Sequence, residues 1–211
     1  MELAHRTLPR RLHALSGLVP VGAFLLFHLA VNASAMRGAA AYDDAVHRLQ
    51  RLPFSLALEV ALVFAPMAYH ALYGLYLAAT RPTGDPGARP GRRRLAIFQR
   101  ATGIPLFAYV LFHLWTTRLV GVREHDHAGV DLFHWMQALY SAPWIRTAYV
   151  FGLLCATGHF SAGLWLSAED WGLARTPAAR AAAGALAAAV FVSLAILGLR
   201  TLSAFRLPPS S

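Results

Sequence analysis

Five long apolar stretches alternate along this chain with shorter polar segments. They cover residues 12–34, 54–80, 98–120, 144–166 and 181–202. Each has about 20 residues or more, which is enough for a helix to cross a hydrocarbon core of about 30 Å. Periodicity cannot divide such long apolar runs into strands, so their length favours helices. The pattern predicts an all-α integral membrane protein, with five transmembrane helices in a single membrane domain over residues 1–211.

The composition agrees with a membrane protein and excludes several other classes. Apolar residues make up 57% of the chain, charged residues only 14%, and the mean hydropathy is +0.46. The net charge is +9 and every basic residue is arginine. Without a nucleic-acid-binding motif, such a charge indicates cytoplasmic loops rather than nucleic-acid binding. Cys155 is the single cysteine, so there is no disulfide framework and no cysteine-based iron–sulfur or zinc site within the chain.

The arginines are distributed unevenly over the loops. They gather before the first apolar stretch, between the second and third, and between the fourth and fifth, whereas the opposite loops mix both signs. The positive-inside rule therefore predicts a cytoplasmic N-terminus and an external C-terminus. Arg10, Arg11 and the run Ala33-Ser34-Ala35 also imitate a signal peptide. We disfavour that interpretation, because cleavage would remove His28, a candidate ligand.

One histidine lies in each of the first four apolar stretches: His28, His70, His113 and His159. Each sits about 24 Å along its helix, at a rise of about 1.5 Å per residue. Because successive helices run in opposite directions, His28 and His113 share a level near the outer face, and His70 and His159 share one near the inner face. The two levels are roughly 15–20 Å apart. Paired neutral imidazoles can hold a haem iron from both sides, so we predict two bis-histidine haem b groups.

The chain also looks duplicated. His70 and His159 are each followed four residues later by glycine (Gly74 and Gly163), then by leucine, an aromatic residue and leucine. A glycine at that spacing lies on the same helical face as the histidine, where it leaves room for something flat and bulky. Ser16-Gly17 in the first helix likewise corresponds to Thr102-Gly103 in the third. Two similar helical hairpins would form a haem-binding four-helix bundle, with the fifth helix at its periphery.

Membrane histidines have other uses. A single one often hydrogen-bonds a neighbouring helix or lines a proton path. A haem-free transporter or proton channel with a histidine relay is therefore the alternative of a different class. Four histidines in depth-matched pairs, with repeated glycines, favour haem.

Seven short motifs, in or next to the first three apolar stretches, point to one protein family. They are Arg11–Gly17, Phe27-His28, Val31-Asn32, Leu52-Pro53-Phe54, Ala57-Leu58-Glu59, Tyr69–Gly74 and Phe98–Gly103. Together they resemble the cytochrome b membrane-anchor subunit of succinate dehydrogenase and fumarate reductase, in its five-helix, two-haem, single-polypeptide form. The cytochromes b of other membrane oxidoreductases, such as hydrogenases or formate dehydrogenases, also hold haem with membrane histidines but share fewer of these motifs.

The resemblance implies partners that the residues alone do not. A flavoprotein subunit and an iron–sulfur subunit would bind at the inner face of a bacterial cytoplasmic membrane. Electrons would pass between succinate and a quinone, commonly menaquinone, reached near the outer haem. The chain alone cannot oxidise succinate, because it has neither a flavin fingerprint nor iron–sulfur cysteines. Its part would be electron transfer within the respiratory complex II of the tricarboxylic acid cycle.

One position departs from part of the family. Some members, notably fumarate reductases, carry a glutamate two residues before the fourth histidine and use it in proton transfer. Thr157 stands there in this chain. A proton path through that carboxylate is therefore not expected, and succinate oxidation is the first interpretation, with quinol:fumarate reduction as the alternative.

Other polar residues have candidate roles near the haems. Glu59 lies eleven residues before His70, on the same face near the outer helix end, where it could exchange protons with a quinol or simply be solvated by headgroups. Asp43 and Asp44 are weaker candidates that we expect in a solvated loop. The haem propionates need cationic or hydroxyl partners, for which four residues are suitably placed: His13, Ser16, Arg100 and Thr102.

Two further groups belong to the membrane surface. His125, Asp126, His127 and His134 could bind a metal, but their spacing fits no standard site and a solvated outer loop is the preferred interpretation. Trp115, Trp144 and Trp171 lie where an interfacial aromatic belt is expected.

Overall fold

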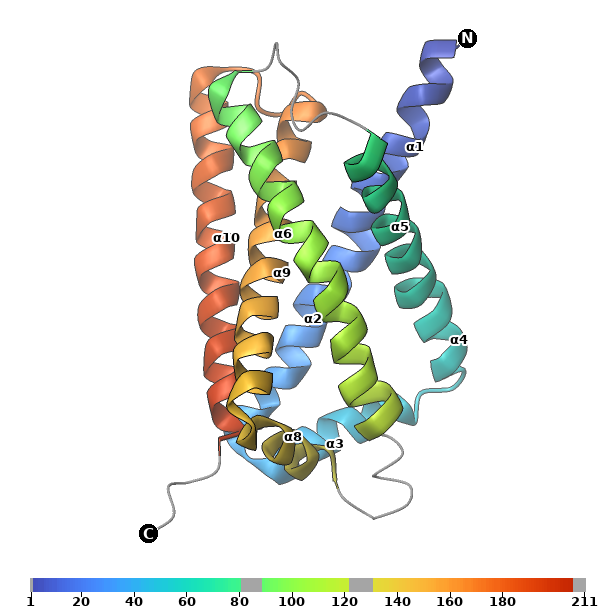
Figure 1. Ribbon diagram of the computed structural model, residues 1–211, viewed down its shortest axis with the longest axis vertical. Coiled ribbons are helices and arrows are strands. Elements are labelled where there is room, and N and C mark those ends of the chain that lie inside the picture. Colours follow the sequence, from blue (N-terminus) through green and yellow to red (C-terminus); the bar gives the residue numbers. More distant parts are fainter. Residues whose placement is uncertain (1, 81–88, 122–130, 207–211) are drawn as a thin grey trace.

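The computed structural model describes residues 2–80, 89–121 and 131–206. Within these ranges every regular element is a helix. Five of the helical stretches are long and apolar enough to cross a membrane: Leu8–Arg37, Ser55–Thr80, Pro90–Gly121, Pro143–Asp170 and Pro177–Ala204. The prediction of an all-α membrane protein with five spanning helices is confirmed. Figure 1 shows them as one bundle, with the two chain termini at opposite ends.

The first two spans change helix type where proline interrupts them. The first consists of α1 (Glu2–Ser16), a π-helical turn η1 (Gly17–Val21), α2 (Gly22–Asn32) and a 3₁₀ turn η2 (Ala33–Arg37). The second consists of α4 (Ser55–Glu59), the π-helical turn η3 (Val60–Phe64) and α5 (Ala65–Thr80). Pro20 lies in η1, and Pro66 is the second residue of α5, just after η3. Proline has no N–H to donate to the preceding turn, and a wider π turn lets the helix continue past it.

The other three spans are longer than predicted. They are α6 (Pro90–Leu114) with the π-helical turn η4 (Trp115–Gly121), then α9 (Pro143–Asp170) and α10 (Pro177–Ala204). Each begins with proline, which suits the first helical turn. The third begins eight residues before the predicted start at 98, because its arginine-rich first turns extend beyond the apolar stretch. α9 packs between α6 and α10, and α1 packs against α5 (Figure 1).

Two short helices close the end of the bundle opposite the N-terminus. They are α3 (Ala39–Gln50) and α8 (Leu132–Ser141), which pack together across the bottom of Figure 1. The expectation of a solvated loop at Asp43 is wrong, because Asp43 lies in α3 and its carboxylate accepts the Phe133 N–H of α8 at 3.2 Å. Burial raises the pKa of Asp43 above its usual range. Asp44 does face solvent, in an ion pair with Arg48.

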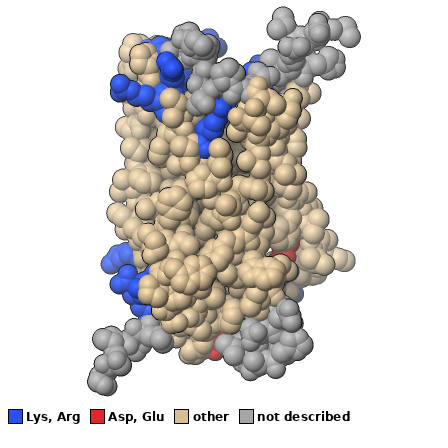
Figure 2. All heavy atoms as spheres, in the orientation of Figure 1, with Lys and Arg blue, Asp and Glu red and all other residues tan. Residues whose placement is uncertain are grey.

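The buried core is concentrated at this same end. It joins η2, α3, α8, α9 and the end of α10 through eight buried residues: Ala35, Tyr42, Phe133, Met136, Tyr140, Ile145, Tyr149 and Phe205. By contrast, none of the residues of α4, η3 or α5 is buried. Figure 2 shows an almost uncharged surface between arginines at the two ends, as a membrane-spanning bundle requires.

Candidate functional site

The four membrane histidines meet in two pairs. The ring centroids of His28 and His113 lie 5.7 Å apart, and those of His70 and His159 lie 6.0 Å apart. In both pairs the rings are nearly perpendicular, at 83° and 84°. Each pair joins one helix of the first hairpin to one of the second. These are the pairs that depth along the helices predicted.

The pair formed by His70 and His159 lies toward the N-terminal end of the bundle, and we call it the inner pair. On its first side, the His70 ring packs on Gly17 of η1. A Cβ atom at Gly17 would lie 2.3 Å from Cε1 of His70, so only glycine leaves room for the ring. The Nδ1–H of His70 donates to the carbonyl of His13 at 3.0 Å, and the Ser16 hydroxyl lies 3.5 Å from the same nitrogen.

The second side of the inner pair repeats this arrangement. The His159 ring packs on Gly103 of α6, where a Cβ atom would lie 2.8 Å from Cε1 of His159. The Nδ1–H of His159 donates to the carbonyl of Gln99 at 3.0 Å, and the Thr102 hydroxyl lies 3.5 Å from it. Sequence reasoning noticed the repeated Ser16-Gly17 and Thr102-Gly103 but missed that their glycines seat the histidines. The repeat itself was the available signal.

These hydrogen bonds decide which nitrogen of each ring carries the proton. A carbonyl oxygen can only accept, so Nδ1 must be the protonated nitrogen in both His70 and His159. The lone pair of each neutral ring is then on Nε2, the atom suited to bind a metal ion. At His159 this lone pair accepts from the Gln99 side-chain amide at 3.2 Å. Both rings are therefore held in the tautomer that leaves the lone pair on Nε2.

The side chains of His13 and Gln99 take equivalent places beside the inner pair. The His13 ring stacks on His70, with centroids 4.2 Å apart and planes within 6°. It also lies against Gly74, where a Cβ atom would be 3.1 Å from Cε1 of His13. Gly163 lies against Gln99 in the same way, with a corresponding distance of 3.3 Å to the amide nitrogen. In this structure Gly74 therefore lies against the His13 imidazole and Gly163 against the Gln99 amide.

His28 and His113 form the outer pair. The Asn32 side-chain amide lies 3.3 Å from Nε2 of His28 and donates to the His28 carbonyl at 2.7 Å. The His113 ring stacks on Tyr109 and meets Tyr149 edge to face. No hydrogen-bond partner for its buried Nδ1 exists among residues 2–80, 89–121 and 131–206. The outer pair therefore lies among aromatic side chains, and one of its ring nitrogens, Nδ1 of His113, has no partner in the described part of the chain.

The distance between the two pairs follows from the helices that carry them. Gly17 contacts the inner pair, and His28 lies eleven residues further along the same span. Gly103 contacts the inner pair, and His113 lies ten residues further along α6. At about 1.5 Å per residue, the levels are about 15–17 Å apart. The two histidine pairs are therefore separated by about half the thickness of a hydrocarbon core of about 30 Å.

The remaining candidate residues occupy both ends of the bundle. The guanidinium of Arg100 reaches the carbonyl of Ala78 at 3.4 Å, near the inner end of α5. The Glu59 carboxylate forms an ion pair with Arg118 of η4 at 2.8 Å, which links the second and third spans. Sequence reasoning did not foresee this partner. Glu59 and Arg118 are each about two-fifths exposed, so solvent and headgroups still reach the pair.

The structure describes only part of the proposed surface groups. Among residues 2–80, 89–121 and 131–206, no three histidines, cysteines or carboxylates gather as a metal site. Three of the proposed cluster, residues 125–127, lie outside the described ranges, and His134 pairs with Asp131 at 2.7 Å. Cys155 is buried in α9. Three tryptophans are exposed at helix ends, as an interfacial belt requires: Trp115, Trp144 and Trp171.

The donor set fits haem iron. Neutral imidazoles are common iron ligands, and a histidine ligand usually donates its other ring N–H to a carbonyl, as His70 and His159 do. Buried polar atoms without partners in the described part of the chain also lie beside both pairs: Nδ1 of His13, Oε1 of Gln99 and Nδ1 of His113. Such atoms are costly in an apolar interior unless another group satisfies them.

Comparison with known proteins identifies the family of this chain. Residues 94–197 match the family described as the succinate dehydrogenase/fumarate reductase transmembrane subunit. The chain is also 39% identical over 197 residues to the protein of Bacillus subtilis (strain 168) named succinate dehydrogenase cytochrome b558 subunit. The aligned region covers 93% of this chain and 95% of that relative. No solved structure matches the chain significantly. Because the likeness extends over nearly the whole length of both proteins, the chain belongs to the family of transmembrane cytochrome b subunits of succinate dehydrogenase and fumarate reductase.

Proposed function

We propose that this chain is the dihaem cytochrome b anchor of a succinate:quinone oxidoreductase. It passes electrons between an iron–sulfur subunit and a membrane quinone, with menaquinone as the first candidate. The observation that carries the proposal is the pairing of four membrane histidines at two levels, with ring centroids 5.7 and 6.0 Å apart. Family membership favours a cytochrome over the haem-free histidine relay.

Each pair would hold one haem b through His28 and His113 or through His70 and His159. When bound, haem b would supply one-electron chemistry at its iron. The chain's own part is to orient the rings. The carbonyls of His13 and Gln99 hold Nδ1–H of the inner pair, and Gly17 lets the His70 ring approach the first helix. His13, Ser16, Arg100 and Thr102 remain the candidates for haem propionates.

The end of the bundle that carries the inner pair is proposed to be cytoplasmic. The arginine-rich segments of the sequence reach this end, and Figure 2 shows arginines gathered there. Arg89 and Arg92 form ion pairs with Glu169 beside the start of α6. The flavoprotein and iron–sulfur subunits would bind here, and electrons would enter at the inner pair. The N-terminus would then be inside and the C-terminus outside.

The outer pair would exchange electrons with quinone, and Glu59 is the candidate for proton exchange there. The direction of turnover is proposed to be succinate oxidation. Thr157 supports this, because its side chain is wholly buried and its hydroxyl donates to the Leu153 carbonyl at 2.9 Å. It offers no carboxylate for a proton path beside the fourth histidine.

The test is a reduced-minus-oxidised spectrum with haem quantification on the purified chain in detergent. We expect two b-type haems per chain. His28→Ala or His113→Ala should remove the outer haem and leave the other, whereas His70→Ala or His159→Ala should do the reverse. His134→Ala, on the surface helix α8, is the control and should keep both.

Two results would contradict the proposal. Two full haems in His28→Ala would refute the pairing. A folded wild-type sample without haem, after expression with adequate haem supply, would refute the dihaem function and return attention to a histidine relay.

A further inference from the structure

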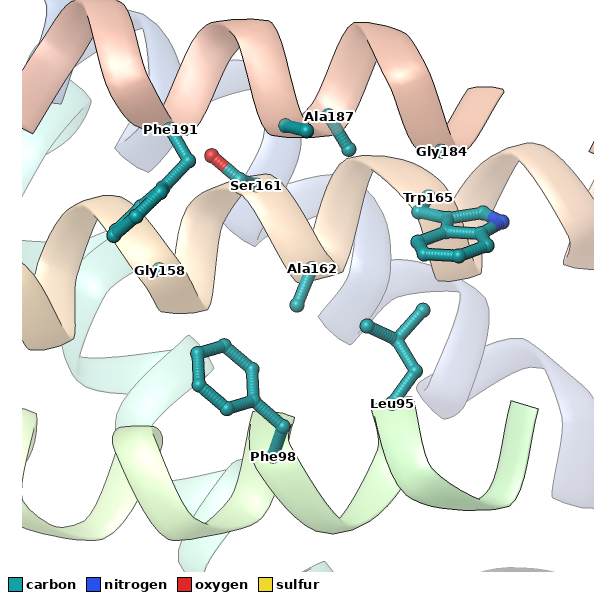
Figure 3. Close-up of a pocket in the computed structure, with 10 residues that line it drawn as sticks. Leu95, Phe98, Gly158, Ser161, Ala162, Trp165, Gly184, Ala187 and Phe191 are labelled. Atoms are coloured by element: carbon teal, nitrogen blue, oxygen red, sulfur yellow. The ribbon is translucent and has the colours of Figure 1, made fainter. Parts of the chain in front are cut away.

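An apolar groove of about 190 Å³ lies between α6, α9 and α10 in the inner half of the bundle. Figure 3 shows Leu95 and Phe98 of α6 on one side and α10 on the other, with α9 between them. The groove follows residues 158–165 of α9 and 184–191 of α10, a rise of about 10 Å along each helix. Since an apolar cavity of about 150 Å³ can bind benzene, this groove has room for roughly seven carbon atoms.

Two arginines lie at the inner end of this groove. Arg94 precedes Phe98 by one helical turn on α6, and Arg180 precedes Gly184 by one turn on α10. Because Phe98 and Gly184 line the groove, each arginine shares the groove-lining face of its helix. Both lie about 6 Å closer to the inner end than the lining residue one turn away. The groove therefore runs from apolar walls to a basic mouth.

The positive charge at this mouth is not neutralised by the chain. No carboxylate of the residues that the structure describes forms an ion pair with Arg94 or Arg180, whereas the nearby Arg92 is paired with Glu169. The Arg180 guanidinium donates to the carbonyl of Arg175, in the loop before α10, and so lies toward the inner end. Figure 2 shows arginines gathered at this end of the bundle, next to an uncharged surface.

An anionic phospholipid has a part for each of these surfaces. Phosphate oxygens accept charge-assisted hydrogen bonds from guanidinium groups, and basic pockets between membrane helices bind anionic headgroups. A phosphate at the level of Arg94 and Arg180 directs the acyl chain below it into the groove. An apolar helix of another protein would cover the walls but leave both arginines without an anion. A zwitterionic lipid would bring an ammonium group to the same place and gain less from the two charges.

We propose that the groove between α6, α9 and α10 binds an acyl chain of an anionic phospholipid, such as phosphatidylglycerol, and that Arg94 and Arg180 bind its phosphate. The lipid fills the space between α6 and α10, two spans that each pack on α9, and so stabilises the fifth span on the bundle. This binding depends on the membrane-spanning fold and is independent of haem and of the direction of electron transfer.

The test is native mass spectrometry of the haem-loaded full chain in detergent. It is titrated with dioleoylphosphatidylglycerol or with dioleoylphosphatidylcholine, which has the same acyl chains, and the wild type should bind the first more tightly. Replacing both arginines, Arg94→Gln with Arg180→Gln, should weaken phosphatidylglycerol binding about thirtyfold, at about fivefold for each basic residue near an anionic headgroup. The matched control, Arg93→Gln with Arg200→Gln, removes the same charge from exposed positions outside the groove and should bind like the wild type.

The acyl chain needs a test separate from that of the headgroup. Ala188→Phe places an aromatic ring at the exposed rim of the groove and should remove one bound phosphatidylglycerol per chain. Ala189→Phe is its matched control, because Ala189 is also exposed on α10 but does not line the groove. This control should keep the wild-type stoichiometry.

Three results would overturn the proposal. Equal binding of the two phospholipids by the wild type, or a double arginine variant that binds like its control, would exclude recognition of an anionic headgroup. An unchanged stoichiometry in Ala188→Phe would show that the acyl chain does not occupy the groove. Inorganic phosphate that raised the thermal midpoint as much as phosphatidylglycerol, in the wild type and Ala188→Phe alike, would replace the lipid by a free anion.

Discussion

The contact between Gly17 and His70 allows a sharp test of the inner pair. A Cβ atom at Gly17 would lie 2.3 Å from Cε1 of His70, whereas carbon atoms in contact normally lie about 3.5–4.0 Å apart. Gly17→Ala therefore forces the ring to move by more than about 1 Å. The bond between Nδ1–H of His70 and the His13 carbonyl, 3.0 Å long, then breaks or lengthens.

The cost can be worked out from this geometry. Overpacking typically destabilises by about 1–3 kcal/mol. An interhelical hydrogen bond in a membrane contributes about 0.6 kcal/mol on average and at most about 1.7. Alanine is favoured over glycine in a helix by about 1 kcal/mol, which offsets part of the loss. The net decrease in the free energy of unfolding should be about 1–4 kcal/mol, on combining these terms.

The assay is thermal unfolding in detergent together with haem quantification. Gly17→Ala should lower the midpoint and reduce the haem held by His70 and His159, while the outer haem remains. Gly103→Ala should have a smaller effect, because its Cβ would be 2.8 Å from the His159 ring. Gly91→Ala is the control, since nothing lies within 4 Å of its Cβ position. A Gly17→Ala chain with two haems and the wild-type midpoint would show that this contact does not position His70.

Two further predictions concern the polar ends of the bundle. Glu169→Ala should lower the free energy of unfolding by about 1–3 kcal/mol, because it leaves Arg92 without the bond made to this carboxylate, which is only 9% exposed. Asp44→Ala, which removes a solvent-exposed pair, should leave the thermal midpoint unchanged. Equal losses of stability in Glu169→Ala and Asp44→Ala would refute this prediction. Asp131 caps α8 and, although burial raises its pKa, hydrogen bonds from the His134 N–H and ring hold the pKa below its usual range. Asp131→Ala should therefore lower the free energy of unfolding by about 1 kcal/mol at neutral pH. Unfolding measured as a function of pH should show this difference from the wild type shrinking below about pH 4, as the carboxylate protonates. A difference that does not change on acidification would refute the prediction.

Much of the architecture was accessible from the sequence. The number of spans depends on the length of apolar runs, and the sorting of His28 with His113 and of His70 with His159 depends only on helix rise and alternating direction. Both are local quantities that the rest of the fold cannot change. The helices α3 and α8 were missed because each is too short to span a membrane, so a pattern judged by spanning length assigned their residues to loops.

Contacts between helices could not be read in the same way. The spacing of residues along one helix does not set its rotation about its own axis, nor the rotamers of its side chains. The sequence by itself determined an all-helical, five-span membrane protein with four histidines at two depths. Only the tertiary structure decided that Gly17 and Gly103 seat the inner rings and that Arg118 meets Glu59, because each of these requires two helices to be placed against one another.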